Sequence, residues 1–486
     1  MNAGIDFGTS NCSIGVWKDN QPSLLKLEDE STLMASALYT SKANVPIMEI
    51  DENELRKRVA TAKRTHATEL KKAKEKGDSI RSLTNEEIEN REHGVMRREL
   101  AEKEKKEYEK QTISDALYSE SEIVFGEAAI KKHIENPQSG YFIKSPKSFL
   151  GAKIMPHQIE LFTEIITRML AHIKDCAQIQ IEKEIDSVVI GRPVNFHGTR
   201  AEDGNKQALG ILERSAIASG FKNVEFLYEP IAAALDYERG INKDLIALVL
   251  DAGGGTTDCS MVKVGPSYKG KSVRDESILG YAGTRIGGTD MDIKLAMRKI
   301  MPYFGKDSLR NSGLPIPSSV FWNAVSINDV NAQTNFFSEG IGREIEQLIV
   351  QATEKQKVTR LRTLYKGRYS YRLNRSSELA KISLSDRDLI NLPLRYIESD
   401  FVIEISKQDL RNAISEELTT IITLMKDVER QAQTTPNVIY VTGGVAKSPI
   451  VQEYIRSHFS GQDIIVGNLF GSVTSGLTTW AHRIFR

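Results

Sequence analysis

The pattern of apolar and polar positions predicts a β-hairpin within the first twenty residues. Residues 3–6 form a short apolar run that ends at an aspartate, and residues 12–17 alternate as a strand does. Residues 8–11 between them are glycine, threonine, serine and asparagine, which favour turns.

Further along the chain, predicted strands alternate with predicted helices. Residues 185–191, 244–250 and 438–441 are continuous apolar runs between turn residues, as buried strands are. Helical periodicity is present at 207–219 and 472–483, and another helix is expected to begin at Pro230 and end with Gly240 as its C-cap. Residues 121–134 predict a strand and then a helix. This alternation favours an α/β fold.

Residues 51–112 differ in composition from the rest of the chain. Charged residues of both signs dominate the segment, and up to residue 110 Tyr108 is its single aromatic residue. The run at 101–107 strongly favours a helix. We expect a solvated helical insertion held by charge pairs one turn apart, with a partner-binding arm as the alternative.

Composition narrows the class of protein. A chain of 486 residues predicts two or more domains, and its 65 basic residues balance 65 acidic ones. No net charge therefore attracts it to nucleic acid or to an anionic membrane. Cys12, Cys176 and Cys259 are too far apart for a CxxC zinc or redox motif. The apolar runs suggest neither a signal peptide nor a membrane span, so a cytoplasmic location is expected.

A near-repeat separated by about 245 residues is the most informative feature. Residues 5–14 match residues 250–261 at Asp, Gly, Cys and Ser if the second copy carries a two-glycine insertion. In that alignment Asp6 matches Asp251 and Cys12 matches Cys259. Two copies of one strand–turn–strand unit predict two homologous domains that face one another.

Each copy has the chemistry that binds a nucleoside triphosphate. Glycines let the backbone N–H groups approach phosphate oxygens, and nearby hydroxyls add donors. Asp6 and Asp251 end strands predicted to be buried, where a carboxylate is costly without a cation. A hydrated Mg²⁺ held between them would supply that charge. The alternative is that both copies are ordinary glycine hairpins.

Three motifs resemble those of the actin-like ATPases: residues 4–10 the first phosphate motif, 251–258 the second and 441–449 the adenosine motif. Four further stretches resemble the DnaK-type, seventy-kilodalton heat-shock chaperones more than actins or sugar kinases, namely 147–151, 191–194, 228–235 and 283–292. The likeness is greatest to a divergent bacterial branch of that family.

The resemblance implies an actin-like ATPase fold, in which two duplicated ribonuclease-H-like lobes enclose a nucleotide cleft. Lobe I would span 1–243, with the charged helical insertion at 51–112. Lobe II would span 244–465, and residues 466–486 would form a closing helix that returns to lobe I. The implied activity is slow hydrolysis of ATP to ADP and phosphate.

Roles are implied residue by residue. Asp6 and Asp251 would organise Mg²⁺ through water, Lys147 would place the attacking water, Glu229 would bind a magnesium water, and Asp258 would help activate the nucleophile. These roles supply the positioning and charge that phosphoryl transfer needs. The residues expected to hold ATP or ADP are Gly8, Thr9, Ser10, Asn11, Gly253, Gly254, Gly255, Thr256, Thr257, Gly287, Gly288, Glu378, Lys381, Ser385, Gly443, Gly444 and Lys447.

Plainer roles exist for the catalytic candidates. Lys147 lies among other lysines and could be a surface residue. Glu229 could serve only as an acidic residue at a helix N-terminus, and Asp258 could cap a turn.

Two departures from the family pattern affect the expected output. Ile382 and Lys447 replace arginines that stack on the base, which predicts weaker or less selective ATP binding. The chain ends at Arg486, so no peptide-binding β-sandwich is expected after the closing helix. An unfolded client or a co-chaperone would then have to bind elsewhere, and the oligomeric state stays open.

Three other functions remain compatible with the same fold. An actin-like or MreB-like ATPase would form filaments, which a bulky insertion would hinder. A small-molecule kinase would need an acceptor pocket, for which the sequence has no signature. A degenerate scaffold would bind nucleotide without turnover.

Overall fold

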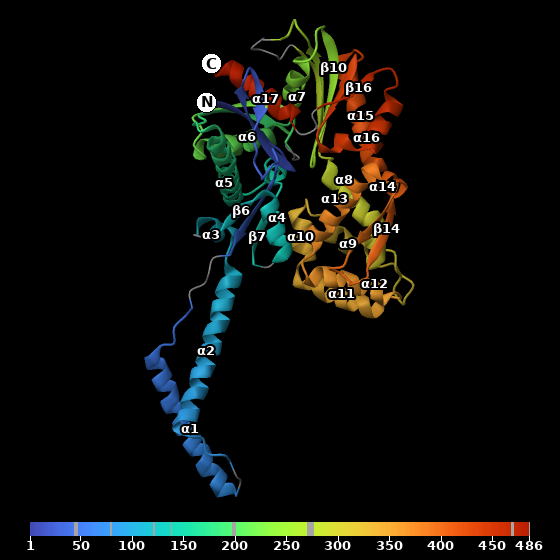
Figure 1. The fold of residues 1–486 in the computed structure, drawn as a ribbon. Coiled ribbons are helices and arrows are strands. Elements are labelled where there is room, and N and C mark those ends of the chain that lie inside the picture. The colour runs from blue at the N-terminus through green and yellow to red at the C-terminus, as the bar shows by residue number, and fades with distance from the viewer. Residues whose placement is uncertain are drawn as a thin grey trace. The chain divides into compact units, whose positions relative to one another are not determined.

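The computed structural model describes residues 1–42, 47–77, 80–119, 122–137, 139–196, 201–269, 277–467 and 471–485 (Figure 1). The chain forms two compact units. The large unit comprises residues 1–39, 124–138 and 142–486, and the small unit comprises 40–123 and 139–141. The boundaries of the two lobes proposed from the sequence stay a prediction.

The first sheet of the large unit is built around the predicted N-terminal hairpin. Its strands follow the order β3 (Gln21–Leu24), β2 (Asn11–Lys18), β1 (Asn2–Phe7), β8 (Ser187–Arg192) and β9 (Asn223–Tyr228), with β4 (Met34–Ala35) also paired to β2. Strands β1 and β2 are antiparallel, whereas β1, β8 and β9 are parallel. The hairpin prediction is confirmed, and β8 falls on the apolar run that predicted it.

The second sheet repeats this plan. Its order is β12 (Ile278–Thr284), β11 (Thr257–Val264), β10 (Leu245–Ala252), β15 (Val438–Thr442) and β16 (Asp463–Val466). Strands β10 and β11 form the antiparallel hairpin, and β15 and β16 continue parallel to β10. Both sheets therefore place one hairpin next to two parallel strands, which confirms the predicted duplicated α/β fold.

The strand registers correct the alignment of the two copies. Asp6 pairs with Ser13 across the first hairpin, and Asp251 pairs with Asp258 across the second. The same number of residues separates each pair, so the two-glycine insertion expected from the sequence is wrong. The glycines of the second turn occupy the places of Thr9 and Ser10 and are not additional residues.

The two cysteines consequently do not match. Cys12 faces Phe7 across the first hairpin, whereas Cys259 faces Leu250 across the second. The alignment from sequence matched identical side chains in the two copies. The pairing of backbone groups between strands, however, sets which positions are equivalent. Ser13, and not a carboxylate, stands where the second hairpin has Asp258.

Helices make up most of the rest of the large unit. They are α4 (Gly126–Glu135), α5 (Pro156–Ile181), α6 (Ala201–Ala218), α7 (Glu229–Glu238), α8 (Gly288–Leu295), α9 (Ser318–Val325), α10 (Val330–Phe336), α11 (Glu339–Gln351), α12 (Lys355–Lys366), α13 (Ser370–Asp386), α14 (Lys407–Ala413), α15 (Ser415–Ala432), α16 (Pro449–His458) and α17 (Ser472–Ile484), with the short 3₁₀ turn η1 (Pro146–Phe149) and the hairpin β13 (Leu389–Pro393) and β14 (Val402–Ser406).

Helix α7 begins as predicted, with a proline in its first turn, but its predicted C-cap is wrong. The cap residue is Arg239, which keeps right-handed helical dihedral angles, and the N–H of Gly240 bonds to the carbonyl of Tyr237 at 3.1 Å. The chain leaves this helix through a tight turn and needs no left-handed glycine there.

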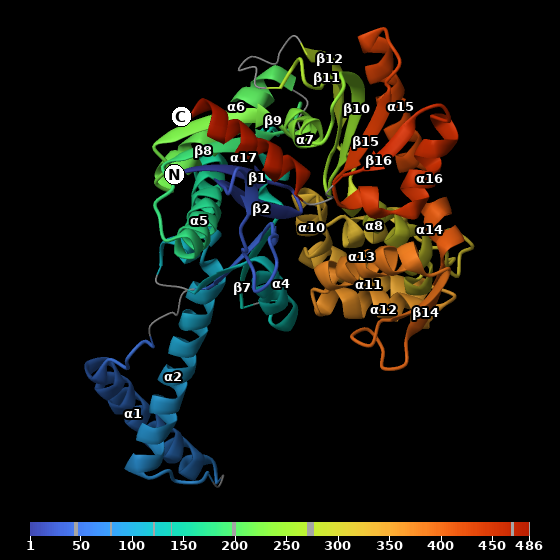
Figure 2. The same ribbon diagram turned by 45° about the horizontal axis from the view of Figure 1, so that its top comes forward.

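Helices α7 and α17 cross at very short range, beside β1 (Figures 1 and 2). A Cβ atom on Gly476 of α17 would lie 1.8 Å from the carbonyl oxygen of Ala232 in α7. Likewise, a Cβ atom on Gly4 of β1 would lie 2.3 Å from the backbone nitrogen of Thr478. Buried residues of α7, α17 and both sheets form one apolar cluster, so this crossing joins the two sheets.

The small unit is the charged helical insertion that the sequence predicted. It contains α1 (Glu52–Lys76), α2 (Asn85–Lys110) and α3 (Ile113–Tyr118). Asp51 caps α1, and Thr84 forms a capping box at the start of α2. Few apolar side chains are buried between the long helices, among them Leu55, Val59 and Met96.

The unit boundaries fall at or within three short strands. These are β5 (Ala37–Ser41), β6 (Ile123–Phe125) and β7 (Gly140–Lys144), which form a sheet in the order β6-β5-β7. Across the described part of the chain, no helix is long and apolar enough to cross a membrane.

Gly476→Val tests the helix crossing. The larger side chain has no space beside Ala232, so we expect a loss of stability of about 2 kcal/mol or more, measured by thermal or urea unfolding. Gly461→Ala is the control, because no atom lies within 4 Å of its added Cβ. Equal unfolding curves for the two variants would contradict the proposed tight crossing.

Candidate functional site

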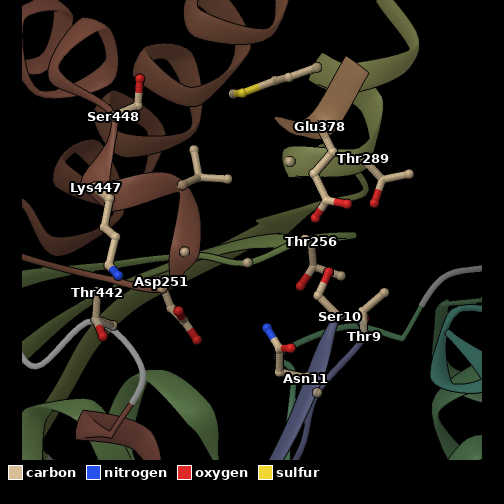
Figure 3. A pocket seen from close by; sticks show the side chains of 18 of the residues that line it. Thr9, Ser10, Asn11, Asp251, Thr256, Thr289, Glu378, Thr442, Lys447 and Ser448 are labelled. Atoms are coloured by element: carbon tan, nitrogen blue, oxygen red, sulfur yellow. The ribbon is translucent and has the colours of Figure 1, made fainter. Parts of the chain in front are cut away.

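A cleft of about 650 Å³ opens in the large unit where the two hairpin turns meet (Figure 3). Its lining comes from the β1–β2 turn, the β10–β11 turn, α13 and the loop after β15. Figure 3 shows Thr9, Ser10 and Asn11 on one side and Lys447 and Ser448 on the other. This volume suits a ligand as large as a nucleotide.

Most of the residues predicted from the sequence line this one cleft. They are Asp6, Gly8, Thr9, Ser10, Asn11, Lys147, Glu229, Asp251, Gly253, Gly254, Thr256, Gly288, Glu378, Lys381, Ser385, Gly443, Gly444 and Lys447. The structure thus brings together residues from distant parts of the chain.

Four predicted residues lie behind the cleft wall instead. The hydroxyl of Thr257 donates to the carbonyl of Ile286 at 2.7 Å, and the N–H of Gly287 donates to a carboxylate oxygen of Asp290 at 2.9 Å. Asp258 is buried, and Gly255 packs against Thr9. Thr257, Gly287 and Gly255 thus support the lining residues, whereas the carboxylate of Asp258 acts on the cleft through its charge beside Lys147.

The two hairpin turns are in direct contact, which explains the glycines of the second. A Cβ atom on Gly254 would lie 1.5 Å from Oγ of Ser10, and one on Gly255 would lie 2.4 Å from Cγ2 of Thr9. Gly443 has a φ of 87°, and a Cβ there would lie 2.4 Å from the carbonyl oxygen of Ala252. Only glycine allows the backbones to approach this closely.

A buried ion pair lies at the inner end of the cleft. Nζ of Lys147, in η1, lies 2.5 Å from Oε1 of Glu229, the first residue of α7, and each residue is only 6% exposed. The alternative of a surface lysine is therefore wrong. Glu229 does begin a helix, but its carboxylate also holds the ammonium group.

Three aspartates share this environment with the ion pair. Burial, reinforced by the charge of Glu229, raises the pKa of Asp6 to about 7 and that of Asp258 to about 7. Burial and the same neighbour raise the pKa of Asp251 well above its ordinary value. Burial lowers the pKa of Lys147, but the surrounding carboxylates outweigh it and the net shift is upward.

This group of buried carboxylates would favour the binding of a cation. Four carboxylates and one ammonium group lie together, so a divalent cation would favour the ionised form of the carboxylates. Among the described residues, no three His, Cys, Asp or Glu side chains are placed to coordinate a metal ion directly. Mg²⁺ commonly keeps several of its waters, so the donor set fits a hydrated ion.

Helix α13 supplies the side chains at the other end of the cleft. Glu378, Lys381 and Ser385 follow the three-and-four spacing that places residues on one helix face. Nζ of Lys381 donates to the carbonyl of Gly288 at 2.9 Å, and Arg375 forms an ion pair with Glu378 at 2.8 Å.

Asp292 is a cleft residue that the sequence analysis did not assign. It is buried, lies 2.7 Å from Nζ of Lys381, and burial raises its pKa to about 6. A signal was present, because this aspartate stands between the apolar residues Met291 and Ile293. A carboxylate in an apolar stretch requires a cationic partner.

Other lining residues were not assigned individually from the sequence, although five of them lie in the motifs at 283–292 and 441–449. They are Ser13, Leu33, Thr289, Met291, Asp386, Ile414, Thr442, Val445, Ser448, Gln452, Ser472 and Val473. Ile382 lines the cleft and is 53% exposed. In Figure 3 the side chain of Lys447 points toward Thr442 and Asp251.

Comparison with known proteins adds independent information. Residues 147–308 match the family described as Hsp70 protein. The chain is 24% identical over 360 residues to the chaperone protein DnaK of Endomicrobium trichonymphae, covering 71% of this chain and 46% of that relative. It is 28% identical over 207 residues to the chaperone protein DnaK of Methanothermobacter thermautotrophicus, covering 41% of this chain and 31% of that relative.

These matches agree with the two duplicated sheets, and the fold is the actin-like ATPase fold. The chain spans less than half the length of these relatives. The expected closeness to one divergent bacterial branch stays a prediction.

Asp258→Asn tests the electrostatics of the cleft. Unfolded Asp258 titrates near 3.8 and folded Asp258 near 7, so the folded state retains the proton between these values. The contribution of Asp258 to the free energy of unfolding therefore falls by up to about 4 kcal/mol as pH rises from about 4 to about 7, and the variant lacks this contribution.

The measurement is urea unfolding across this pH range without nucleotide or divalent cation. Asp203→Asn on the exposed surface of α6 removes the same charge and serves as the control. If Asp258→Asn runs parallel to the unaltered protein at all pH values, the buried carboxylate does not have the expected pKa.

Proposed function

We propose that this member of the DnaK-type Hsp70 family binds ATP with Mg²⁺ in the cleft and hydrolyses it to ADP and phosphate. One observation carries the proposal: the buried Lys147–Glu229 pair lies at the cleft's inner end, where both glycine turns and three aspartates converge. Lysine near a terminal phosphate and a carboxylate near the water meet the needs of phosphoryl transfer.

The hairpin turns would hold the phosphates. Gly253 and Gly254, with the hydroxyl-bearing residues Thr9, Ser10 and Thr256, line the place where the turns meet. The N–H of Gly253 donates to the carbonyl of Thr256 at 2.9 Å, which closes the second turn, so the phosphates would rely on the other N–H groups and on the hydroxyls. Consecutive N–H groups in a turn form a concave anion site. Bound Mg²⁺ would neutralise phosphate charge, with Asp6 and Asp251 holding its waters.

Lys147 and Asp258 would act on the attacking water. The ammonium group of Lys147 would orient the water and offset the charge on the terminal phosphate. The N–H of Val194 donates to Oδ1 of Asp258 at 3.3 Å, which fixes this carboxylate behind the cleft wall. A pKa near neutrality suits a group that accepts a proton from water as the phosphorus–oxygen bond forms.

The other end of the cleft would bind the nucleoside. Glu378, Lys381 and Ser385 would contact the ribose and adenine, with Asp292 holding Lys381 in place. Ile382 would pack on the base without the cation–π interaction of an arginine. The side chain of Lys447 points toward Asp251. It would therefore act as a point charge close to the phosphates and would not stack on the base.

The nucleotide cycle would serve chaperone work with an unfolded client or a co-chaperone in the cytoplasm. The names of the relatives support this, but the chain matches less than half of their length. The charged helices α1 and α2 offer a surface for such a partner.

Lys147→Ala tests the hydrolysis. Loss of the buried ammonium removes the group that positions the water, so we expect ATP cleavage to fall by about 10²-fold or more, measured under single turnover. Lys153→Ala is the matched control, because Lys153 is exposed nearby in the chain. Equal cleavage by both variants would reject Lys147 as the catalytic lysine.

Ile382→Arg tests the proposed base site. A guanidinium group over the base would add about 0.5–2 kcal/mol, so we expect ATP to bind about two- to thirty-fold more tightly by calorimetry. Leu379→Arg adds the same side chain to α13 at a position that is 48% exposed and does not line the cleft. Tighter binding by both variants would indicate a general charge effect and not base stacking.

A further inference from the structure

A second, narrow cavity adjoins the cleft at its phosphate end. Thr9 and Thr289 line both cavities, and Gly255, which lies behind the cleft wall, lines the second. Its other walls come from residues 144–149 and from the loops that contain Arg285 and Asn328. Thr9 and Thr289 therefore separate the second cavity from the cleft.

The second cavity has the charge of an anion site. Lys144 and Arg285 line it, and among the described residues its lining includes no carboxylate. The nearby carboxylate of Asp290 accepts hydrogen bonds from the N–H of Gly287 at 2.9 Å and from Nδ2 of Asn328 at 3.0 Å. The hydroxyl-bearing residues of the lining are Thr9, Ser145, Ser148 and Thr289.

The two cations lie at different depths. Arg285 is exposed, whereas Lys144 is half-buried, so the cavity leads from the phosphate end of the cleft toward the surface at Arg285. The positive charges of Lys144 and Arg285, placed one after the other along the cavity, would lower the energy of an anion that passes them. Neither cation belongs to the residues proposed above for binding or cleavage.

The passage is narrow, and its wall is firmly held. Its volume of about 20 Å³ is enough for about one water molecule. Ser145 in the wall has a φ of 57°, an uncommon value for a residue with a side chain, and its N–H donates to the carbonyl of Ser36 at 2.8 Å. Larger anions would therefore pass by movement of the Thr, Lys and Arg side chains and not of the backbone.

From this arrangement we infer that the second cavity is the exit path for inorganic phosphate, an inference that rests on the proposed ATP hydrolysis. Water forms a bond to the terminal phosphorus, the bond from that phosphorus to the bridging oxygen breaks, and ADP keeps the bridging oxygen. The proton released in this step goes to solvent. The phosphate anion moves past Thr9 to Lys144 and leaves at Arg285, while ADP still fills the cleft.

Arg285→Glu provides the test, in a single turnover of ATP by the full chain. Rapid acid quench measures cleavage, and a fluorescent phosphate-binding protein measures the appearance of free phosphate. A carboxylate at the mouth repels the anion, so we expect release to slow by about tenfold while cleavage changes by less than about twofold. Arg214→Glu makes the same charge reversal on exposed α6 and is the matched control.

Each outcome has a distinct meaning. If phosphate release keeps pace with cleavage in Arg285→Glu, the exit path is elsewhere. If cleavage and release slow together, Arg285 acts on the chemistry and the inference is overturned. If the unaltered protein does not cleave ATP, the proposed function itself fails. If circular dichroism shows that Arg285→Glu is unfolded, the rates of cleavage and phosphate release are compared in Lys144→Gln instead. We expect phosphate release by that variant to slow by about threefold.

Discussion

Negative charge is concentrated where the two hairpin turns meet, and the arrangement of the cleft depends on it. Four carboxylates lie near the buried ammonium group of Lys147, and burial raises the pKa of the three aspartates among them, so their ionised forms are unfavourable without a further cation. Removing a charged group from water is costly, and that cost is offset only by a partner of opposite charge. A ligand that brings a divalent cation would supply the missing positive charge, which explains why so many polar groups converge on one cleft.

Close backbone packing holds these charges in position. The glycines of the second turn let it touch Thr9 and Ser10, and Gly476 lets α17 cross directly over α7. Helix α7 carries Glu229 at its first residue, so the crossing also fixes the partner of Lys147. A single apolar cluster continues through both helices and both sheets. Stability of the core and geometry of the cleft are therefore properties of the same contacts.

The α13 end of the cleft follows the same electrostatic rule with different side chains. Asp292 is buried against Lys381, and Arg375 holds Glu378. Each ion pair orients a side chain that lines the cleft. By contrast, Ile382 is about half-exposed and apolar, so no ion pair holds its side chain at the α13 end of the cleft.

Local patterns along the chain were enough to predict most secondary-structure elements and to suggest nucleotide chemistry. Alternation and apolar runs located the strands, and the two Asp–Gly turns predicted residues that line the cleft, because these signals depend on residues close together in the chain. The three-dimensional packing was needed to establish which residues of the two hairpins are equivalent and which side chains are buried. Strand register paired Asp6 with Ser13 and removed the supposed insertion, since hydrogen bonding between strands, and not side-chain identity, sets the alignment. Burial distinguished Lys147 from the surface lysines near it, because burial depends on segments far apart in the sequence.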